Sequence, residues 1–260
     1  MNDRDMWGAF GALGKNRDAF CLRYPASLIG TLVERTGLAV GGRVLEIGCW
    51  TGGLRLPLMQ RGLHVTAIDL GEAMRRIAEP KSTPHDSAAA VAADFETLDV
   101  EEGAYDVVAA TRPFRWISPD IAYPASRRAL RAGGFLALIR NLHPRANSST
   151  SPLLAEALGH RAPVMPTAKP WSPDEEIEKM RHELAATGLF SEPEVFLFPW
   201  SILHIVEEVV RFQRALSDHL ALAPSVCRRL LASAREAIDG NGGQIDRPLV
   251  STLILSRRQG

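Results

Sequence analysis

The chain has 260 residues, of which 46% are hydrophobic and 23% charged, and its 30 basic residues are balanced by 30 acidic ones. This is the composition of a soluble globular protein, and it excludes a largely disordered chain. The charge balance argues against a nucleic-acid binder that depends on phosphate neutralisation, and the apolar runs are far shorter than the about 20 residues that span a membrane.

The cysteines and the first residues indicate the compartment. Cys21, Cys49 and Cys227 form an odd set without CxxC spacing, which predicts reduced thiols and neither a disulfide framework nor a zinc cluster. The start of the chain carries acids and lacks the apolar stretch of a secretory signal. We therefore expect a cytoplasmic protein without a metal centre.

In the first half of the chain, apolar strands alternate with helices. The predicted elements are a helix at 27–36, a strand at 43–47, a helix at 54–60, strands at 64–69, 88–93 and 105–110 with a helix at 72–78 between the first two, a helix at 119–131 and a strand at 135–140. This alternation predicts βαβ units in a doubly wound parallel sheet. The ligand crevice of such a sheet lies at the carboxyl ends of the strands.

The second half is less regular. Residues 144–173 are polar at first and contain five prolines from Pro152 to Pro173, a pattern typical of a long loop or lid. The elements predicted after it are a helix at 174–187, a strand at 194–198, helices at 203–216 and 224–238, and a last strand at 249–255.

A glycine turn follows the first strand. Glu46 lies two residues before Gly48, Gly52 follows, and Asp69 ends the second strand 21 residues after Gly48. Glycines let the backbone approach a ligand, and an acid at the end of the second strand can accept both hydroxyls of an adenosine ribose. A dehydrogenase that binds NAD is disfavoured, because the glycines fit the G-x-G-x-x-G pattern poorly and Asp94 has no role in it.

The ordered set of motifs resembles the class I S-adenosylmethionine (SAM)-dependent methyltransferases, especially the bacterial small-molecule enzymes. The segments that carry the resemblance are 44–49, 65–70 with Met74, Asp94-Phe95, 105–108, 116–119 and 129–135, with 198–200, 216–219 and 242–243 near the end of the chain. The resemblance implies an α/β fold: a doubly wound, mostly parallel seven-stranded Rossmann-like sheet with an antiparallel last strand and a helical cover.

The resemblance also implies a cofactor site and a domain plan. Asp69 would hold the ribose of SAM, Asp94 the adenine amino group, and Phe95 would flank the ring. Residues 1–40 would form an N-terminal helical segment, 41–143 the cofactor-binding core, and 144–260 the cover helices and last two strands of the same domain. The full predicted cofactor set is Glu46, Gly48, Trp50, Gly52, Asp69, Leu70, Asp94 and Phe95.

One departure from the family pattern lies in the glycine turn. The family usually has Gly-x-Gly-x-Gly, whereas the middle position here is Trp50, where the backbone of the family passes close to the methionine part of the cofactor. Overpacking costs about 1 to 3 kcal/mol, or about 5- to 150-fold in affinity. The ring either weakens cofactor binding or turns outward and lines the substrate pocket.

Arginines gather in the loops after the fourth and fifth strands. Arg112, Arg115, Arg140 and His143 would converge over the pocket, and guanidinium groups suit bidentate capture of carboxylate, sulfate or phosphate. This predicts a small anionic substrate or leaving group. The alternative is that some of these arginines lie on the surface, paired with Asp106 or Asp120. The predicted substrate-binding set is Tyr24, Arg112, Arg115, Trp116 and Arg140.

The catalytic candidates are His143, His219 and Arg115. His143 or His219 would act as a general base, although Asp218-His219 also suits a turn in which Asp218 caps a helix. Tyr24 matches a position near the pocket entrance in the family, or is an ordinary packing aromatic. Arg115, with Arg112, would stabilise developing negative charge.

The leading hypothesis is a cytoplasmic methyltransferase of natural-product metabolism that uses SAM and binds neither nucleic acid nor membrane. The first alternative keeps the fold without the cofactor: ring closure by an amine, as in aziridine formation, or elimination, with loss of sulfate or phosphate. The second is a non-catalytic subunit that binds a protein partner.

Overall fold

The computed structural model describes residues 23–48, 52–69, 88–92, 95, 100–111, 114, 117–142, 173–215 and 224–260. The strands within these residues form one seven-stranded sheet with the order β3-β2-β1-β4-β5-β7-β6. The strand order reverses direction between β1 and β4, so the topological switch point of this doubly wound sheet lies between these two strands.

The parallel half of the sheet follows the sequence pattern closely. Its strands are β1 (Arg43–Ile47), β2 (His64–Asp69), β3 (Ala88–Ala92) and β4 (Tyr105–Ala110). Each pairs in parallel with its neighbour, from β3 through β2 and β1 to β4 and on to β5 (Leu130–Leu142). Short runs of buried apolar residues suit strands that are covered on both faces, and the predicted α/β fold is confirmed.

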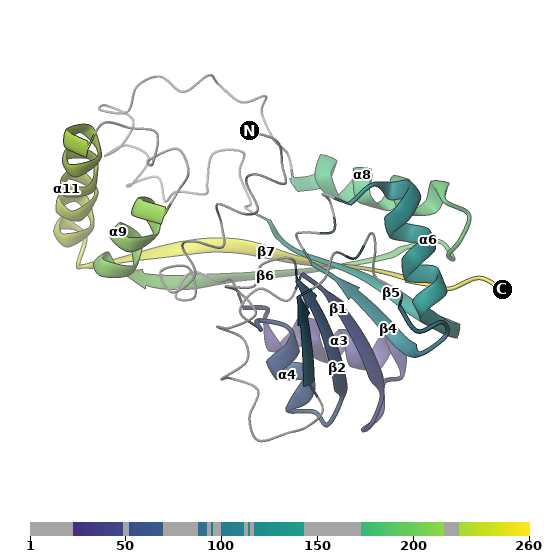
Figure 1. Ribbon diagram of the computed structural model, residues 1–260. Helices are drawn as coiled ribbons and strands as arrows, with labels where there is room; N and C mark the ends of the chain where they lie inside the picture. Colours follow the sequence, from purple (N-terminus) through teal and green to yellow (C-terminus); the bar gives the residue numbers. More distant parts are fainter. Residues whose placement is uncertain are drawn as a thin grey trace.

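Helices cover both faces of this half (Figure 1). On one side lie α3 (Ala26–Thr36) and α4 (Arg55–Met59), and on the other α6 (Pro119–Ala129) and α8 (Pro173–Ala186). Successive strand residues point to opposite faces, so Val44 joins the apolar cluster under α3 and α4 while Leu45 joins the cluster under α6 and α8.

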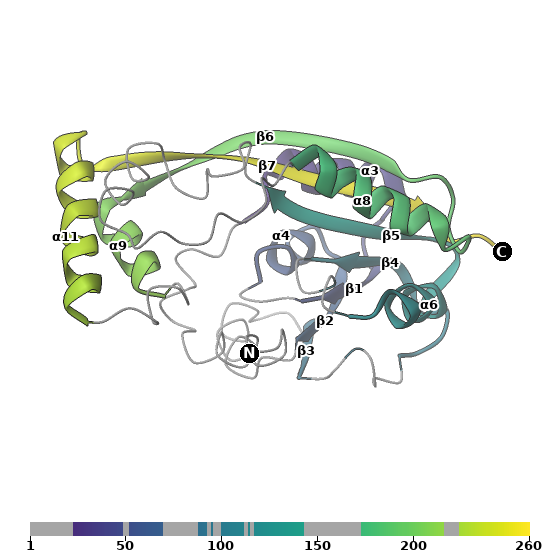
Figure 2. The same cartoon turned by 90° about the horizontal axis from the view of Figure 1, so that it is seen from above.

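The last two strands form a long hairpin. β6 (Glu194–Ile205) and β7 (Gln244–Arg257) are antiparallel, and β7 also pairs antiparallel with β5. The hairpin reaches past the parallel strands to α9 (Val206–Ala215) and α11 (Pro224–Gly240), as Figures 1 and 2 both show. A small apolar cluster of its own joins these two helices to the hairpin.

Three strands are longer than the sequence patterns predicted. Gly133 was predicted to lie in a turn before β5, but it lies inside the strand with φ 73°, where the register against β4 shifts as at a bulge. The strand predicted at 194–198 continues through Pro199 to Ile205, because β6 is an edge strand, where proline is tolerated. β7 begins at Gln244 rather than Leu249.

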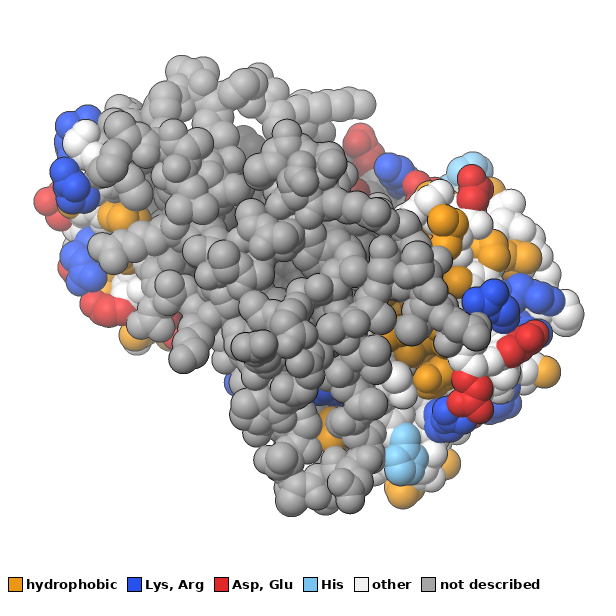
Figure 3. Space-filling view, in the orientation of Figure 1, with side chains coloured by type: hydrophobic (Ala, Val, Ile, Leu, Met, Phe, Trp, Pro, Cys, Tyr) orange, Lys and Arg blue, Asp and Glu red, His pale blue; other side chains and the backbone are white. Residues whose placement is uncertain are grey.

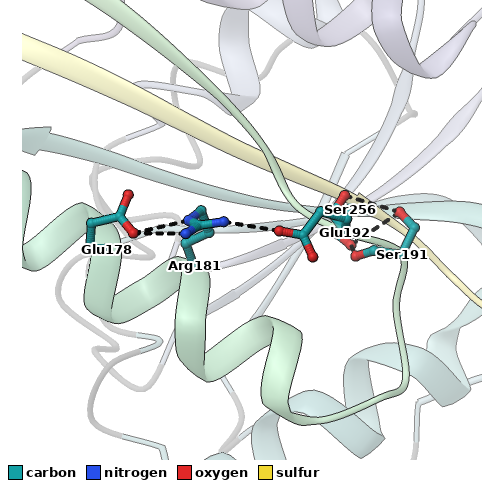
Figure 4. Close-up of polar contacts among 5 residues, drawn as sticks. All are labelled: Glu178, Arg181, Ser191, Glu192 and Ser256. Carbon is teal, nitrogen blue, oxygen red and sulfur yellow. Dashed lines mark hydrogen bonds and ion pairs between the residues drawn. The ribbon is translucent and has the colours of Figure 1, made fainter.

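Polar contacts fix the connection from α8 to β6 (Figure 4). Arg181 bridges Glu178 at 3.0 Å and Glu192 at 2.9 Å, and Ser256 of β7 donates a hydrogen bond to the carbonyl of Ser191. The start of β6 is thereby held against both the helix before it and the strand beside it.

Charges of both signs are mixed on the described part of the face in Figure 3. Among the described residues, none of the helices is both long and apolar enough to cross a membrane.

Candidate functional site

The glycine turn begins where β1 ends. Gly48 has a φ of 84° and Gly52 a φ of 85°, in the left-handed region that favours glycine. A Cβ on Gly52 would meet only the side chain of Leu56, at an ordinary 3.5 Å. Backbone conformation, rather than lack of space, therefore explains the glycine at position 52.

Neighbouring strands hold the first residue of the turn. The N–H of Gly48 donates to the carbonyl of Ile68 at 2.8 Å, which continues the pairing of β1 with β2. Ile68 directly precedes Asp69, whose backbone ends β2 as predicted and pairs with Ala92 of β3. The turn and the acid-bearing strand end thus lie side by side at the carboxyl edge of the sheet.

Glu46 is buried inside the sheet, with 1% of its surface exposed. It pairs in register with Ala67 on β2 and Ala109 on β4, and these small neighbours leave room for its side chain. By strand alternation it lies on the same face as Val44, toward α3 and α4. A carboxylate is therefore buried two residues before Gly48, on the face of the sheet that α3 and α4 cover.

Two residues near the turn were missed by the sequence analysis. Arg55 begins α4 and is 1% exposed, so a positive charge is buried directly after the turn. It is the single charge in the apolar stretch 54–59, a signal that indicates a buried and partnered cation. Thr111, which directly follows β4, is 4% exposed, and its hydroxyl donates to the carbonyl of Gly48 at 2.7 Å.

Phe95 and Tyr24 both pack into apolar clusters. Phe95 is 4% exposed and belongs to the cluster under α6 and α8. Tyr24 is half-buried against the cluster under α3 and α4. The amide of Asn141 donates to the carbonyl of Arg23 at 3.3 Å and so ties the segment before α3 to β5. The ligand-binding roles of Phe95 and Tyr24 stay predictions.

Arg140 forms an ion pair that was not foreseen. Its guanidinium lies 2.6 Å from the carboxylate of Glu176 on α8, with the two side chains 11% and 22% exposed. Asp106, considered as a partner for such arginines, instead binds Arg131 and the backbone N–H of Arg43. Burial raises the pKa of Asp106, but the hydrogen bonds from Arg43 and Arg131 and the charges of these two arginines together outweigh it and hold the pKa below its usual value.

Two further titratable side chains are buried, Tyr123 on α6 and His204 at the end of β6. Burial, with Glu183 adding to it and Arg140 opposing it, raises the pKa of Tyr123 to about 12. His204 is 4% exposed at the end of β6, with Nδ1 3.3 Å from Glu208. Burial lowers the pKa of His204, Glu208 raises it, and Arg247 lowers it further. Both side chains are therefore neutral at pH 7.

Several predicted site residues lie outside the described part of the chain. They are Trp50, Leu70, Asp94, Arg112, Arg115, Trp116, His143 and His219, and the side chain of Asp69 belongs with them. In the described residues, no group of three or more His, Cys, Asp or Glu side chains could hold a metal ion.

Sequence relatives point to one family. Residues 45–138 match the family described as Methyltransferase domain. An uncharacterized methyltransferase of Mycobacterium tuberculosis is 31% identical over 53% of this chain and 54% of its own length. A ubiquinone biosynthesis O-methyltransferase of Pseudomonas aeruginosa is 36% identical over 44% of this chain and 50% of its own. The chain thus spans about half the length of the curated relatives it matches.

Solved structures share the fold at low sequence identity. Phosphoethanolamine N-methyltransferase 2 of Haemonchus contortus, in complex with SAM, aligns with a TM-score of 0.55 at 16% identity over 96% of this chain and 57% of its own. The 4+2 cyclase SpnF aligns with a TM-score of 0.50 at 18% identity over 89% of this chain and 80% of its own. The glycine turn between β2 and β4 thus lies within residues 45–138, the part of the chain that matches a methyltransferase domain, and the chain shares its fold with solved methyltransferase structures.

Proposed function

We propose that this chain is a methyltransferase that binds SAM at the carboxyl ends of β1, β2 and β3 and acts on a small metabolite. The observation that carries the proposal is the glycine turn. Gly48 and Gly52 both have positive φ, and the turn lies between a buried Glu46 and the strand end at Asp69.

The described residues fit an adenosyl cofactor. Because glycine has no side chain, the backbone at positions 48 and 52 can come close to a ligand. Since Gly48 is hydrogen-bonded to Ile68, the turn lies next to the residue that precedes Asp69. A carboxylate at that strand end suits the two hydroxyls of a ribose.

Each part of the chain has a proposed task. SAM, when bound, supplies a methyl group on a sulfonium centre. Asp69 would bind the ribose, Asp94 the adenine amino group, and Glu46 with the glycine turn would position the methionine end. Leu70 and Phe95 would pack beside the adenine. Catalysis would rest on positioning of the acceptor and exclusion of water.

The proposed substrate is small and anionic and belongs to natural-product metabolism. Anion capture is assigned to Arg112 and Arg115, with Trp116 and Tyr24 lining the pocket. Arg140 is already paired with Glu176, so it would bind substrate only by sharing or exchanging that partner. His143 or His219 would remove a proton from the acceptor where one must leave.

Isothermal titration of the purified chain with SAM tests the proposal. We expect saturable binding of one cofactor per chain and weaker binding by Asp69→Asn, because the amide no longer accepts two ribose hydroxyls. Asp120→Asn, at the exposed start of α6, is the matched control and should bind like the wild type. Absence of binding at millimolar SAM would contradict the proposal.

A second candidate is a cofactor-independent ring closure or elimination on the same fold. It is favoured by Trp50, which replaces a family glycine, and by the likeness of the fold to that of a 4+2 cyclase. Arg112 and Arg115 would then stabilise a departing sulfate or phosphate. A folded chain that does not bind SAM, and that converts a sulfated or phosphorylated amine only while both arginines are present, would favour this candidate.

A further inference from the structure

Thr111 holds the point at which the glycine turn leaves β1. Its N–H donates to the carbonyl of Ile47 at 3.1 Å, so it extends the pairing of β4 with β1 by one step. Its side-chain Oγ1 donates to the carbonyl of Gly48 at 2.7 Å and also lies 3.2 Å from the carbonyl of Ile47. The side chain is buried, with the residue 4% exposed.

Gly48 is therefore fixed from both neighbouring strands. On the β2 side its N–H donates to the carbonyl of Ile68 at 2.8 Å, and on the β4 side its carbonyl accepts from Thr111. The regular register of β1 with β4 ends at the pair Ile47 and Ala110. Beyond that pair a side-chain hydroxyl, rather than the strand ladder, holds the Gly48 carbonyl.

The same residue also begins the loop that follows β4. The N–H of Phe114 donates to the carbonyl of Thr111 at 3.0 Å. Thr111 thus connects the glycine turn to the loop that carries Arg112 and Arg115, the arginines proposed to bind the substrate.

We infer that Thr111 is a positioning residue for the cofactor: its hydroxyl sets the Gly48 carbonyl, at the point where the glycine turn leaves β1, before the cofactor binds. The inference rests on the proposed SAM site. The hydroxyl acts through Gly48 and need not touch the cofactor. Because the bond is buried, its loss leaves a carbonyl without this donor in a place that water does not easily reach.

Two substitutions of Thr111 separate the effect of the hydroxyl from the effect of the branched side-chain shape. Thr111→Val keeps the branched shape and removes the donor, and we expect its Kd for SAM to rise about 10-fold. Thr111→Ser keeps the donor and should stay within about 2-fold of the wild type. Ser126→Ala is the matched control, since the buried hydroxyl of Ser126 donates to the carbonyl of Ala122 at 2.7 Å within α6.

Amide hydrogen exchange of the cofactor-free chain gives an independent measurement. Exchange in peptides that cover residues 44–56 should become about 10-fold faster in Thr111→Val, and should not change in Ser126→Ala. If wild-type protein fails to bind SAM, the proposed function fails, while exchange still decides the role of Thr111. Wild-type SAM affinity together with wild-type exchange in Thr111→Val would overturn the inference.

Discussion

The glycine turn lies at the carboxyl ends of the parallel strands, and the distal hairpin, the part of β6 and β7 that carries α9 and α11, extends past the same ends. The two regions are built differently. The start of the turn is held by backbone hydrogen bonds to β2 and to the residue after β4, and by the hydroxyl of Thr111. The hairpin extends past the parallel strands and carries α9 and α11 through a small separate cluster. That cluster consists of Val206, Val209, Val210, Leu231, Ala234, Ile238 and Ile245.

The family match follows this division. It covers residues 45–138, which run from β1 into β5 and include none of β6, α9, α11 or β7. The distal hairpin also leaves Leu203 and Ile205 exposed, while it buries His204 and Arg247. The comparison contrasts an end of the sheet that lies within the family match and whose turn is held by the backbone with a distal hairpin that lies outside the match.

The largest expected effect is a difference in the free energy of unfolding between core substitutions in the two regions. Leu136→Ala, in the fully buried centre of β5, should lower the free energy of unfolding by about 3 kcal/mol. Leu231→Ala, in the small cluster at α11, should cost about 1 kcal/mol, because a small cluster near the surface relaxes around the gap. Urea denaturation measures both, and an equal or larger loss for Leu231→Ala would contradict the comparison.

The next prediction concerns the backbone of the turn. Gly52→Ala adds a methyl group that fits sterically but forces alanine to a φ near 85°, so the turn should shift and SAM affinity should fall about 10-fold. Gly188→Ala is the control: its φ is 64°, and nothing lies within 4 Å of the added Cβ. Both variants should lose similar stability, and calorimetry should find weaker SAM binding in Gly52→Ala alone. Weaker binding by the control as well would argue that general destabilisation is the cause.

A smaller effect is expected at the ion pair between β5 and α8. Glu176→Gln keeps an acceptor for Arg140 but removes the charge, and it should lower the free energy of unfolding by about 1 kcal/mol, less than for a fully buried pair because both side chains retain some exposure. Glu178→Gln, which breaks an exposed pair with Arg181 on the same helix, should lower the free energy of unfolding less than Glu176→Gln does, because solvent screens an exposed pair. Thermal unfolding compares the two variants, and equal losses of stability would show that the Arg140 pair stabilises the fold no more than an exposed ion pair does.

The smallest effect is a pH dependence at the hairpin. Burial lowers the pKa of His204 below its ordinary value of 6.5, against an opposing effect of Glu208 and together with Arg247. The unfolded chain therefore takes up a proton before the folded chain does, and stability falls as pH drops below 6.5, by at most about 1.4 kcal/mol per pH unit. His204→Gln should lose part of the decrease measured between pH 7.5 and pH 5.5. An unchanged pH profile would mean that His204 titrates alike in both states.

Much of the parallel half could be predicted from the sequence, because its strands are short apolar runs between glycines and acids. β1 and β4 have the predicted bounds, and Asp69 ends β2 as expected. The long hairpin was underestimated: β6 was predicted to end at Phe198, but it continues through Pro199, which an edge strand accepts.

The site was harder to predict than the fold. A glycine turn is visible as a motif, but the hydroxyl that holds it lies 63 residues away in sequence. The partner of Arg140 lies 36 residues away, on a helix whose packing on β5 no local pattern reveals. Long-range pairing of this kind depends on tertiary contacts, which explains why Thr111 and Glu176 escaped the sequence analysis.

A crystal structure of the chain with S-adenosylhomocysteine tests the central claim most directly. The account predicts the ribose hydroxyls within hydrogen-bond distance of the Asp69 carboxylate and the amino-acid tail against the backbone of residues 48–52. An indole of Trp50 in the space of that tail, or a ligand bound away from the carboxyl ends of β1 and β2, would contradict it.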